Sequence, residues 1–348
     1  MEDRKQRILR AVTDDYILTG EPVGSRTIAR KYLPGVSPAT IRNEMADLEE
    51  QGYLEQPHAS AGRIPSDLGY RYYVDELMEP PSTDPAEVQE LREQFLTSRD
   101  MERAIRLAGR MLARESRYSS LVMRPTLQRL QLRHVRLAPL DEEHVLLLVV
   151  AEPAFVYNRI LDWDGPAHPR ELEQRSELLT DLLHDFAGQW TRTALESLAA
   201  VMPYSTAREQ LAEALQELMQ ERGPDRAYVE GVSYFLEQPE FRNVEMARQV
   251  LDDLHNPEVL DRLLMHGQVE QLVVVIGQEQ PVMSLRCCSV VMAPYGRGER
   301  VLGVVGVIGP RRMDYRRAVR SVQQVASALS QALESMPPTR GGSLPEDR

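Results

Sequence analysis

The sequence predicts a multidomain α+β fold that begins with an N-terminal winged helix. The chain has 348 residues, which is long for one domain and suits two or three. Residues 1–80 carry helical patterns followed by two short strand patterns. The remainder has strand patterns near both of its ends and helical patterns between them, which indicates an α+β sheet domain interrupted by an insertion.

The composition indicates a cytoplasmic protein without a membrane anchor. No apolar run reaches the roughly 18 residues that span a bilayer, and the opening string MEDRKQRILR lacks the apolar stretch of a signal peptide. The net charge of -12 argues against a protein that coats nucleic acid nonspecifically, because such binding needs many Lys and Arg residues. A small local DNA-reading face is still compatible with this charge.

Residues 22–43 contrast with the acidic total, since they hold four positive charges and no Asp or Glu. An amphipathic helix is expected over residues 3–19, with Ile8 and Val12 facing inward. A second helix is expected to be capped by Ser25. A third is capped by Ser37, has Pro38 in its first turn and stops at Gly52. Two short helices joined by a glycine-containing turn predict a helix-turn-helix.

The third helix has the residue types of a DNA-recognition helix. Ile41, Met45 and Leu48 share one side, so Thr40, Arg42 and Asn43 fall on or near the outer surface. Arg can bind guanine and Asn adenine with two hydrogen bonds each, and Thr can touch a thymine methyl group. These three residues are therefore predicted to read bases; an ordinary amphipathic surface helix is the alternative.

Two short strands over residues 53–56 and 63–64, joined by the acid-free loop 58–62, predict a β-hairpin wing. A last helix, capped by Ser66, should close this domain near Met78, and Pro80 begins a linker. Phosphate or wing contacts are predicted for six residues. They are Ser25, Arg26, Ser37, His58, Ser60 and Arg63.

The rest of the chain alternates between helical and strand patterns. A charged helical stretch is expected over residues 84–120, and strands over 128–137, 144–151 and 154–163. Helices follow over 170–186, 191–200 and 206–221, strands over 271–277, 288–293 and 301–308, and a long helix over 315–336. The tail 337–348 is predicted to be disordered.

No catalytic, cofactor or metal site is predicted. Gly303, Gly306 and Gly309 lie within a strand-like run instead of opening a helix, which disfavours a phosphate loop. The adjacent Cys287 and Cys288 are interpreted as buried strand residues. The seven histidines show no metal-ligand spacing. Arg312 and Asp314 are predicted to fix the turn before the last helix, with a ligand contact as the alternative.

Three stretches of the sequence resemble those of a known family. EPVGSRTIA, VSPATIRNEMADLEEQGYLEQPHASAGRIPSDLGYRYYVDEL and, far downstream, LGVVGVIGPRRMDY resemble the heat-inducible transcription repressor HrcA in order and separation. That family usually has Thr at the positions of Ser66 and Arg311. Ser66 keeps the helix cap, whereas Arg311 replaces a hydroxyl with a charge and puts any role of that side chain in doubt.

The resemblance implies a GAF-like domain and an inserted dimerisation segment. The expected boundaries are 1–80 for the winged helix, 81–120 for a helical connector, 121–204 with 268–338 for the GAF-like domain, 205–267 for the insertion and 339–348 for a flexible tail. On this interpretation the insertion contains the stretches 228–234 and 239–241. Without the resemblance, the aromatic residues of these stretches are interpreted as core residues.

The resemblance also implies a function. A homodimer should bind double-stranded DNA at an inverted repeat of the CIRCE type and repress chaperone operons. The GroEL chaperonin should keep it active, and heat should release it from DNA. Two alternatives stay open: a regulator whose GAF-like pocket senses a small molecule, and a catalytic α+β body fused to a DNA-binding module. The missing active-site constellation disfavours the second.

Overall fold

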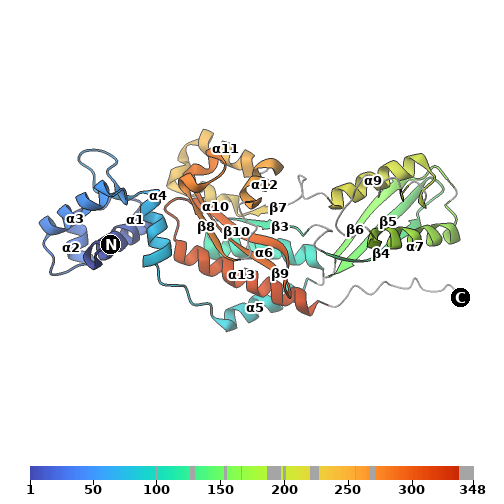
Figure 1. The fold of residues 1–348 in the computed structure, drawn as a ribbon, viewed down its shortest axis with the longest axis horizontal. Coiled ribbons are helices and arrows are strands. Elements are labelled where there is room, and N and C mark those ends of the chain that lie inside the picture. The colour runs from blue at the N-terminus through green and yellow to red at the C-terminus, as the bar shows by residue number, and fades with distance from the viewer. Residues whose placement is uncertain are drawn as a thin grey trace.

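The computed structural model describes residues 1–98, 100–125, 130–152, 155–165, 167–185, 197–198, 201–219, 227–254, 256–265 and 271–336. Figure 1 shows an elongated molecule with an N-terminal unit at one end, a five-stranded sheet in the middle and a three-stranded sheet at the other end. Within these ranges, none of the helices combines the length and apolar character needed to cross a bilayer.

The N-terminal unit confirms the predicted order of helices and short strands. It consists of α1 (Asp3–Thr19), α2 (Ser25–Lys31), α3 (Pro38–Glu50), β1 (Leu54–Glu55), β2 (Ile64–Pro65), α4 (Asp67–Tyr72) and the π-helical turn η1 (Tyr73–Leu77). β1 and β2 pair in antiparallel register. Ile8, Ile28, Ile41 and Leu48 are fully buried and hold the three helices together.

The predicted cap at Ser25 is wrong. α2 begins at Ser25 itself, and Gly24 occupies the N-cap position with extended backbone angles (φ -93°, ψ 151°) and no side-chain hydrogen bond. The preceding Val23 explains this start, because its backbone exchanges two hydrogen bonds of 2.9 Å with Arg63 and so remains extended. The caps at Ser37 and Ser66 are confirmed, since their side chains accept hydrogen bonds from Thr40 N and Gly69 N.

The central sheet is antiparallel and covered on both faces. Its strand order is β7 (Ala227–Glu230), β3 (Ser119–Met123), β10 (Arg300–Pro310), β9 (Cys288–Arg297) and β8 (Val273–Ile276). One face packs on α6 (Met101–Ser116) and α13 (Tyr315–Ser335), with α5 (Pro85–Leu96) alongside α13. The other faces α10 (Val232–Leu236), η3 (Pro239–Arg242), α11 (Val244–Leu254) and α12 (Pro257–Met265).

Strand alternation produces these two covered faces. On β9, Val291 and Ala293 belong to the core beneath α6 and α13, whereas Val290 and Met292 belong to the core on the opposite side. Successive strand side chains point to opposite faces, so a sheet buried on both sides reads as a continuous apolar run. The sequence around residues 288–293 and 301–308 has this run, and both predicted strands are confirmed.

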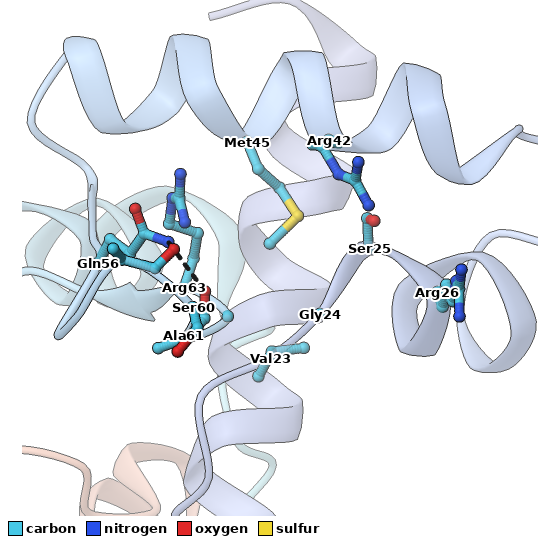
Figure 2. Close-up of a pocket in the computed structure, with 12 residues that line it drawn as sticks. Val23, Gly24, Ser25, Arg26, Arg42, Met45, Gln56, Ser60, Ala61 and Arg63 are labelled. Atoms are coloured by element: carbon cyan, nitrogen blue, oxygen red, sulfur yellow. Dashed lines mark hydrogen bonds between the residues drawn. The ribbon is translucent and has the colours of Figure 1, made fainter.

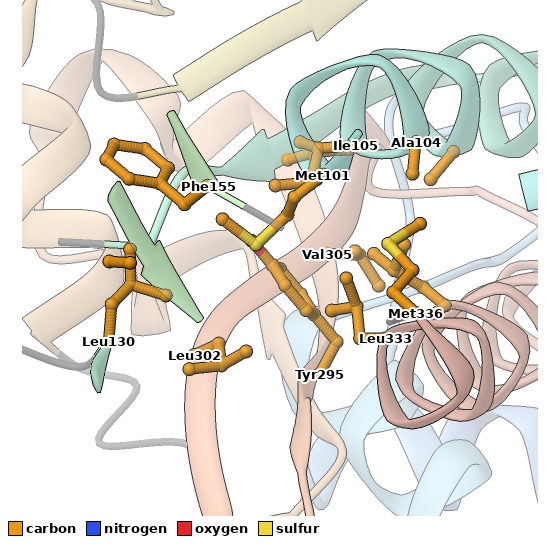
Figure 3. Close-up of a cluster of buried hydrophobic side chains, with 14 of the residues drawn as sticks. Met101, Ala104, Ile105, Leu130, Phe155, Tyr295, Leu302, Val305, Leu333 and Met336 are labelled. Atoms are coloured by element: carbon orange, nitrogen blue, oxygen red, sulfur yellow. The ribbon is translucent and has the colours of Figure 1, made fainter. Parts of the chain in front are cut away.

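The second sheet forms a separate lobe. It consists of β4 (Gln131–Pro139), β5 (His144–Glu152) and β6 (Phe155–Asp162), with α7 (Pro169–Asp185) against β4 and α9 (Ser205–Met219) against β6. Two hydroxyls of α7 accept hydrogen bonds of 2.9 Å from backbone amides of β4, Ser176 from Leu137 N and Thr180 from Val135 N. Figure 3 shows Leu130 and Phe155 of this lobe in one cluster with Leu302 and Tyr295 of the central sheet.

Three predictions about the body are corrected. The strands at residues 131–162 do not join those at 273–310 in one sheet. The expected insertion 205–267 is divided, because α9 packs on the second sheet while β7 pairs with β3 of the central sheet. The expected helical connector is part of the body, since α6 contributes a buried face including Ala104, Ile105 and Leu112 and is followed by the unpredicted strand β3.

Three further predictions are confirmed in whole or in part, and two lie outside the described residues. The last helix occupies Tyr315–Ser335, and the glycines of the rejected phosphate loop lie inside β10. Asp314 caps α13 by accepting from Arg317 N at 3.0 Å, which is the turn-fixing role predicted for it. The local pairing predicted for Arg312 is wrong, because its guanidinium group pairs with Glu240, which is distant in sequence. The tail 337–348 and most of the predicted helix 191–200 are not among the described residues.

Candidate nucleic-acid interface

The recognition candidates lie on the first two turns of α3. Ser37 Oγ accepts a hydrogen bond of 3.1 Å from Thr40 N and lies 2.9 Å from Thr40 Oγ1, so the cap fixes the start of the helix and orients the Thr40 hydroxyl. Arg42 and Asn43 are exposed and Thr40 is partly exposed, while Ile41 and Met45 are buried. This separation of inner and outer residues is the predicted one.

A groove of about 460 Å³ separates α3 from the β1–β2 hairpin and its loop, the segment predicted to be the wing and called the wing below (Figure 2). Residues from the start of α2, from α3 and from the wing line it together. They are Val23, Gly24, Ser25, Arg26, Arg42, Met45, Gln56, Ala59, Ser60, Ala61, Gly62 and Arg63. Figure 2 shows the Arg42 side chain reaching from α3 toward Ser25. Five of the predicted contact residues therefore meet at one concave surface, although they come from distant parts of the N-terminal unit.

The wing is held by an amide that sequence reasoning missed. Gln56 Nε2 donates hydrogen bonds of 3.0 Å to the carbonyl oxygens of Ala59 and Ala61, which closes the loop into a fixed arch. His58 and Ser60 are exposed on this arch. A Cβ at Gly62 would lie 2.4 Å from Val23 O, so only glycine lets the loop pass this close to the start of α2.

Arg63 lies at the base of the wing, where its charge is paired. Its Nη2 atom is 2.7 Å from Glu49 Oε2, and its side chain is only 18% exposed. Its backbone pairs with Val23, and its Nε atom is buried with no hydrogen-bond partner among the described atoms. Ser25 is also largely buried at 8% exposure. These two predicted contact residues line the groove but stand back from its rim.

Several acidic side chains of the N-terminal unit are paired with cations of the same unit. On α3, Glu44 contacts Arg4 at 3.4 Å and Asp47 contacts Lys5 at 2.9 Å, both on α1. Asp15 pairs with Lys31 at 2.6 Å, and this hydrogen bond raises the pKa of Lys31. One of the four cations of residues 22–43 is thus neutralised internally.

The other three cations of that segment remain available. Within the described part of the chain, no ion pair joins Arg26, Arg30 or Arg42 to a carboxylate. All three side chains are exposed, and two of them line the groove. A concave, cation-bearing surface with exposed Arg and Asn on a helix is suited to a polyanion that also presents hydrogen-bonding edges.

Comparison with known proteins agrees with this chemistry. Residues 102–319 match the family model described as the HrcA protein C terminal domain. The heat-inducible transcription repressor HrcA of Symbiobacterium thermophilum is 42% identical over 335 residues, which cover 95% of this chain and 98% of that protein. The protein of the same name from Moorella thermoacetica is 40% identical over 348 residues, with 97% and 99% covered.

A solved structure has the same overall arrangement. It is described as the crystal structure of a hypothetical protein, and it is 26% identical with a TM-score of 0.66, covering 97% of this chain and 100% of that one. The sequence matches run through the N-terminal unit as well as the body, and the family model alone spans more than half of the chain. The chain therefore belongs to the HrcA family of heat-inducible transcription repressors.

Proposed function

We propose that the chain represses transcription by binding an inverted-repeat operator of the CIRCE type as a homodimer, through its N-terminal winged helix. Family membership makes it a transcription repressor and not an enzyme, as predicted. The observation that supports DNA reading is the groove between α3 and the wing, where Arg26 and Arg42 are exposed and pair with no carboxylate of the described residues. DNA binding at this groove would bring the N-terminal turns of α3 to base edges in the major groove.

In this proposal, the role of each predicted contact residue follows from how exposed its side chain is. Thr40, Arg42 and Asn43 read bases, because they lie on the outer side of α3. Arg26 and Ser60 line the groove, Ser37 and His58 are exposed elsewhere on the same unit, and all four are proposed to contact phosphates or sugars. Ser25 and Arg63 form the groove floor and mainly hold α2 and the wing in place.

The three-stranded lobe is the proposed dimer interface. Its inner residues are buried, whereas the outer face carries aliphatic cross-strand pairs, Leu146 with Ile160 and Val150 with Val156. Ile160 is 59% exposed and Val156 is 47% exposed. Leu148 lies between these pairs on the same face, opposite Asn158 on β6 and Arg136 on β4. An exposed apolar patch bordered by polar residues marks an interaction surface. A second copy is the fitting occupant, since a twofold dimer matches an inverted repeat. This face replaces the expected segment 205–267, part of which packs on the central sheet.

Selection from a pool of random duplexes tests the operator and the dimer together. The natural chain should return inverted repeats and sediment as a dimer. The double variant Val156→Asp/Ile160→Asp should sediment as a monomer and return single half-sites, because buried charges oppose an apolar interface. Leu236→Asp is the matched control, since Leu236 is 48% exposed on α10, outside the lobe. A double variant that remains dimeric would refute this interface. If the natural chain selected no common sequence from the pool, the proposed function would be refuted.

We further propose that the central sheet with α6 and α13 is the GAF-like domain of the resemblance, and that β4 to α9 is the insertion. Both faces of the central sheet are covered by helices of its own unit, whereas the three-stranded lobe extends beyond it (Figure 1). With DNA as its target, the chain is proposed to act in the cytoplasm. No cofactor or metal enters this mechanism.

Heat control is proposed to operate through the GroEL chaperonin, as the resemblance implies. A multidomain protein with an apolar dimer face exposes that face whenever the dimer opens, and heating promotes aggregation of such species. A chaperonin would return them to the active dimer. After heat treatment, operator affinity should fall and should recover on incubation with chaperonin and ATP, as measured by titration of labelled operator. Full affinity through heating, with no response to chaperonin, would refute this control.

A further inference from the structure

The N-terminal unit docks on the body through a set of charged contacts, here named the seam: Asp67, Arg71, Glu279, Arg311 and Arg312. Arg311 Nη1 lies 2.8 Å from Asp67 Oδ1. The second oxygen of Asp67 accepts a hydrogen bond of 2.9 Å from Gln278 N. The two Asp67 contacts join the start of α4 to two separate turns of the body.

A second contact of the seam fixes the same helix one turn further along. Arg71 Nε donates to Glu279 Oε1 at 2.8 Å, and Arg71 Nη2 donates to Val274 O at 2.6 Å. Glu279 is itself anchored, because its Oε2 accepts from Ile276 N at 2.8 Å. The planar guanidinium group engages a carboxylate and a carbonyl together, which fixes orientation more strongly than a single point charge does.

Shape complementarity accompanies these charges. Tyr70 of α4 is 2% exposed, and its ring lies 5.7 Å from that of Tyr315, whose hydroxyl donates to Arg311 O. Gly277 has φ +49°, and a Cβ there would lie 2.4 Å from the Asp67 carboxylate. Arg312 pairs with Glu240 and also donates to Ile17 O at 3.3 Å, at the end of α1. The contact is therefore closely packed and touches both α1 and α4.

The seam supplies rigidity that the linker lacks. Residues 79–84, between the N-terminal unit and α5, form neither helix nor strand. A flexible linker alone would let the two DNA-binding units of a dimer adopt many separations. An inverted repeat, in contrast, presents its half-sites at a fixed distance, about 34 Å or a multiple of it, and at a fixed rotation around the duplex.

The geometry points to the seam as the device that sets which half-site spacing the dimer accepts. Arg71 and Arg311 act as positioning residues for operator recognition, with Glu279 and Asp67 as their partners. This inference rests on the proposed function as a DNA-binding homodimer. Arg311 is placed where the family resemblance predicts Thr, a side chain too short to span the same gap to Asp67. The ion pair therefore gives this chain a tighter positioning contact than a hydroxyl would.

A spacing series tests the seam. The DNAs are the selected operator, the same half-sites moved apart by about 5 base pairs, which is half a helical turn, and a single half-site. The natural chain should bind the shifted operator about 100-fold more weakly, since the gain from two linked contacts is lost when geometry forbids both. Arg71→Gln/Arg311→Gln should bind the single half-site like the natural chain but discriminate the two operators less than about 10-fold.

The matched control is Arg103→Gln/Arg248→Gln, because those arginines are 79% and 82% exposed on α6 and α11, outside the seam. It removes the same charge and should keep the full spacing preference. An unchanged circular dichroism spectrum and melting temperature would show that the seam variant is folded. A seam variant that keeps the natural spacing preference, or that loses half-site affinity equally, overturns the inference. Absence of any operator preference in the natural chain would instead defeat the proposed function.

Discussion

Replacing Arg42 and Asn43 together with alanine should reduce operator affinity by about 2 to 6 kcal/mol while leaving binding to random duplexes much less affected. Each side chain is exposed on α3 and can form a two-pronged hydrogen bond to one base, worth about 1 to 3 kcal/mol of discrimination. Roughly additive losses are expected if the two residues contact separate base pairs. Titration of labelled operator and of a scrambled duplex at one salt concentration measures both affinities.

Arg26→Ala is the informative comparison for this prediction. Arg26 is exposed at the start of α2 and faces the same groove, but it is proposed to contact a phosphate. Its removal should weaken binding to all duplexes alike and flatten the dependence of affinity on salt concentration by about one unit of slope. Equal losses on operator and scrambled DNA for the Arg42→Ala/Asn43→Ala variant would contradict base readout by α3.

The N-terminal unit was largely predictable because its structure depends on local signals. Ser37 followed by Pro38 marks the start of α3, and the spacing of Ile41, Met45 and Leu48 defines its buried side. The predicted cap at Ser25 failed because a longer-range contact, the pairing of Val23 with Arg63, kept Val23 extended ahead of α2. Gln56 was missed for a similar reason, since its acceptors are backbone carbonyls of a loop whose path the sequence does not specify.

The body was predictable strand by strand but not as a sheet arrangement. Apolar runs located β5, β9 and β10, yet such runs do not state which strands pair. β3 was missed because its residues directly follow a strong helical pattern, and its partner β7 is more than one hundred residues away in sequence. The seam was beyond prediction for the same reason: Asp67 and Arg311 are separated by 244 residues.

Ile41→Ala should lower the stability of the N-terminal unit by about 2 to 5 kcal/mol, which is the usual cost of truncating a buried isoleucine. Ile41 is 0% exposed and packs between α1, α2 and α3 in the core that positions Arg42 and Asn43. Native-state hydrogen exchange suits the measurement, because it reports opening of α3 separately from unfolding of the body. Operator affinity should fall as well, although the variant retains every proposed DNA contact.

Leu18→Ala provides the matched aliphatic truncation in the same unit. Leu18 is 73% exposed near the end of α1, so its loss should change the opening free energy of α3 by no more than about 0.5 kcal/mol. Slow exchange of the α3 amides in the Ile41→Ala variant, equal to that of Leu18→Ala, would contradict the packing described for this core. If instead α3 opens readily and stabilising solutes restore both protection and operator affinity, then the base-reading side chains depend on the buried face of their own helix for their position.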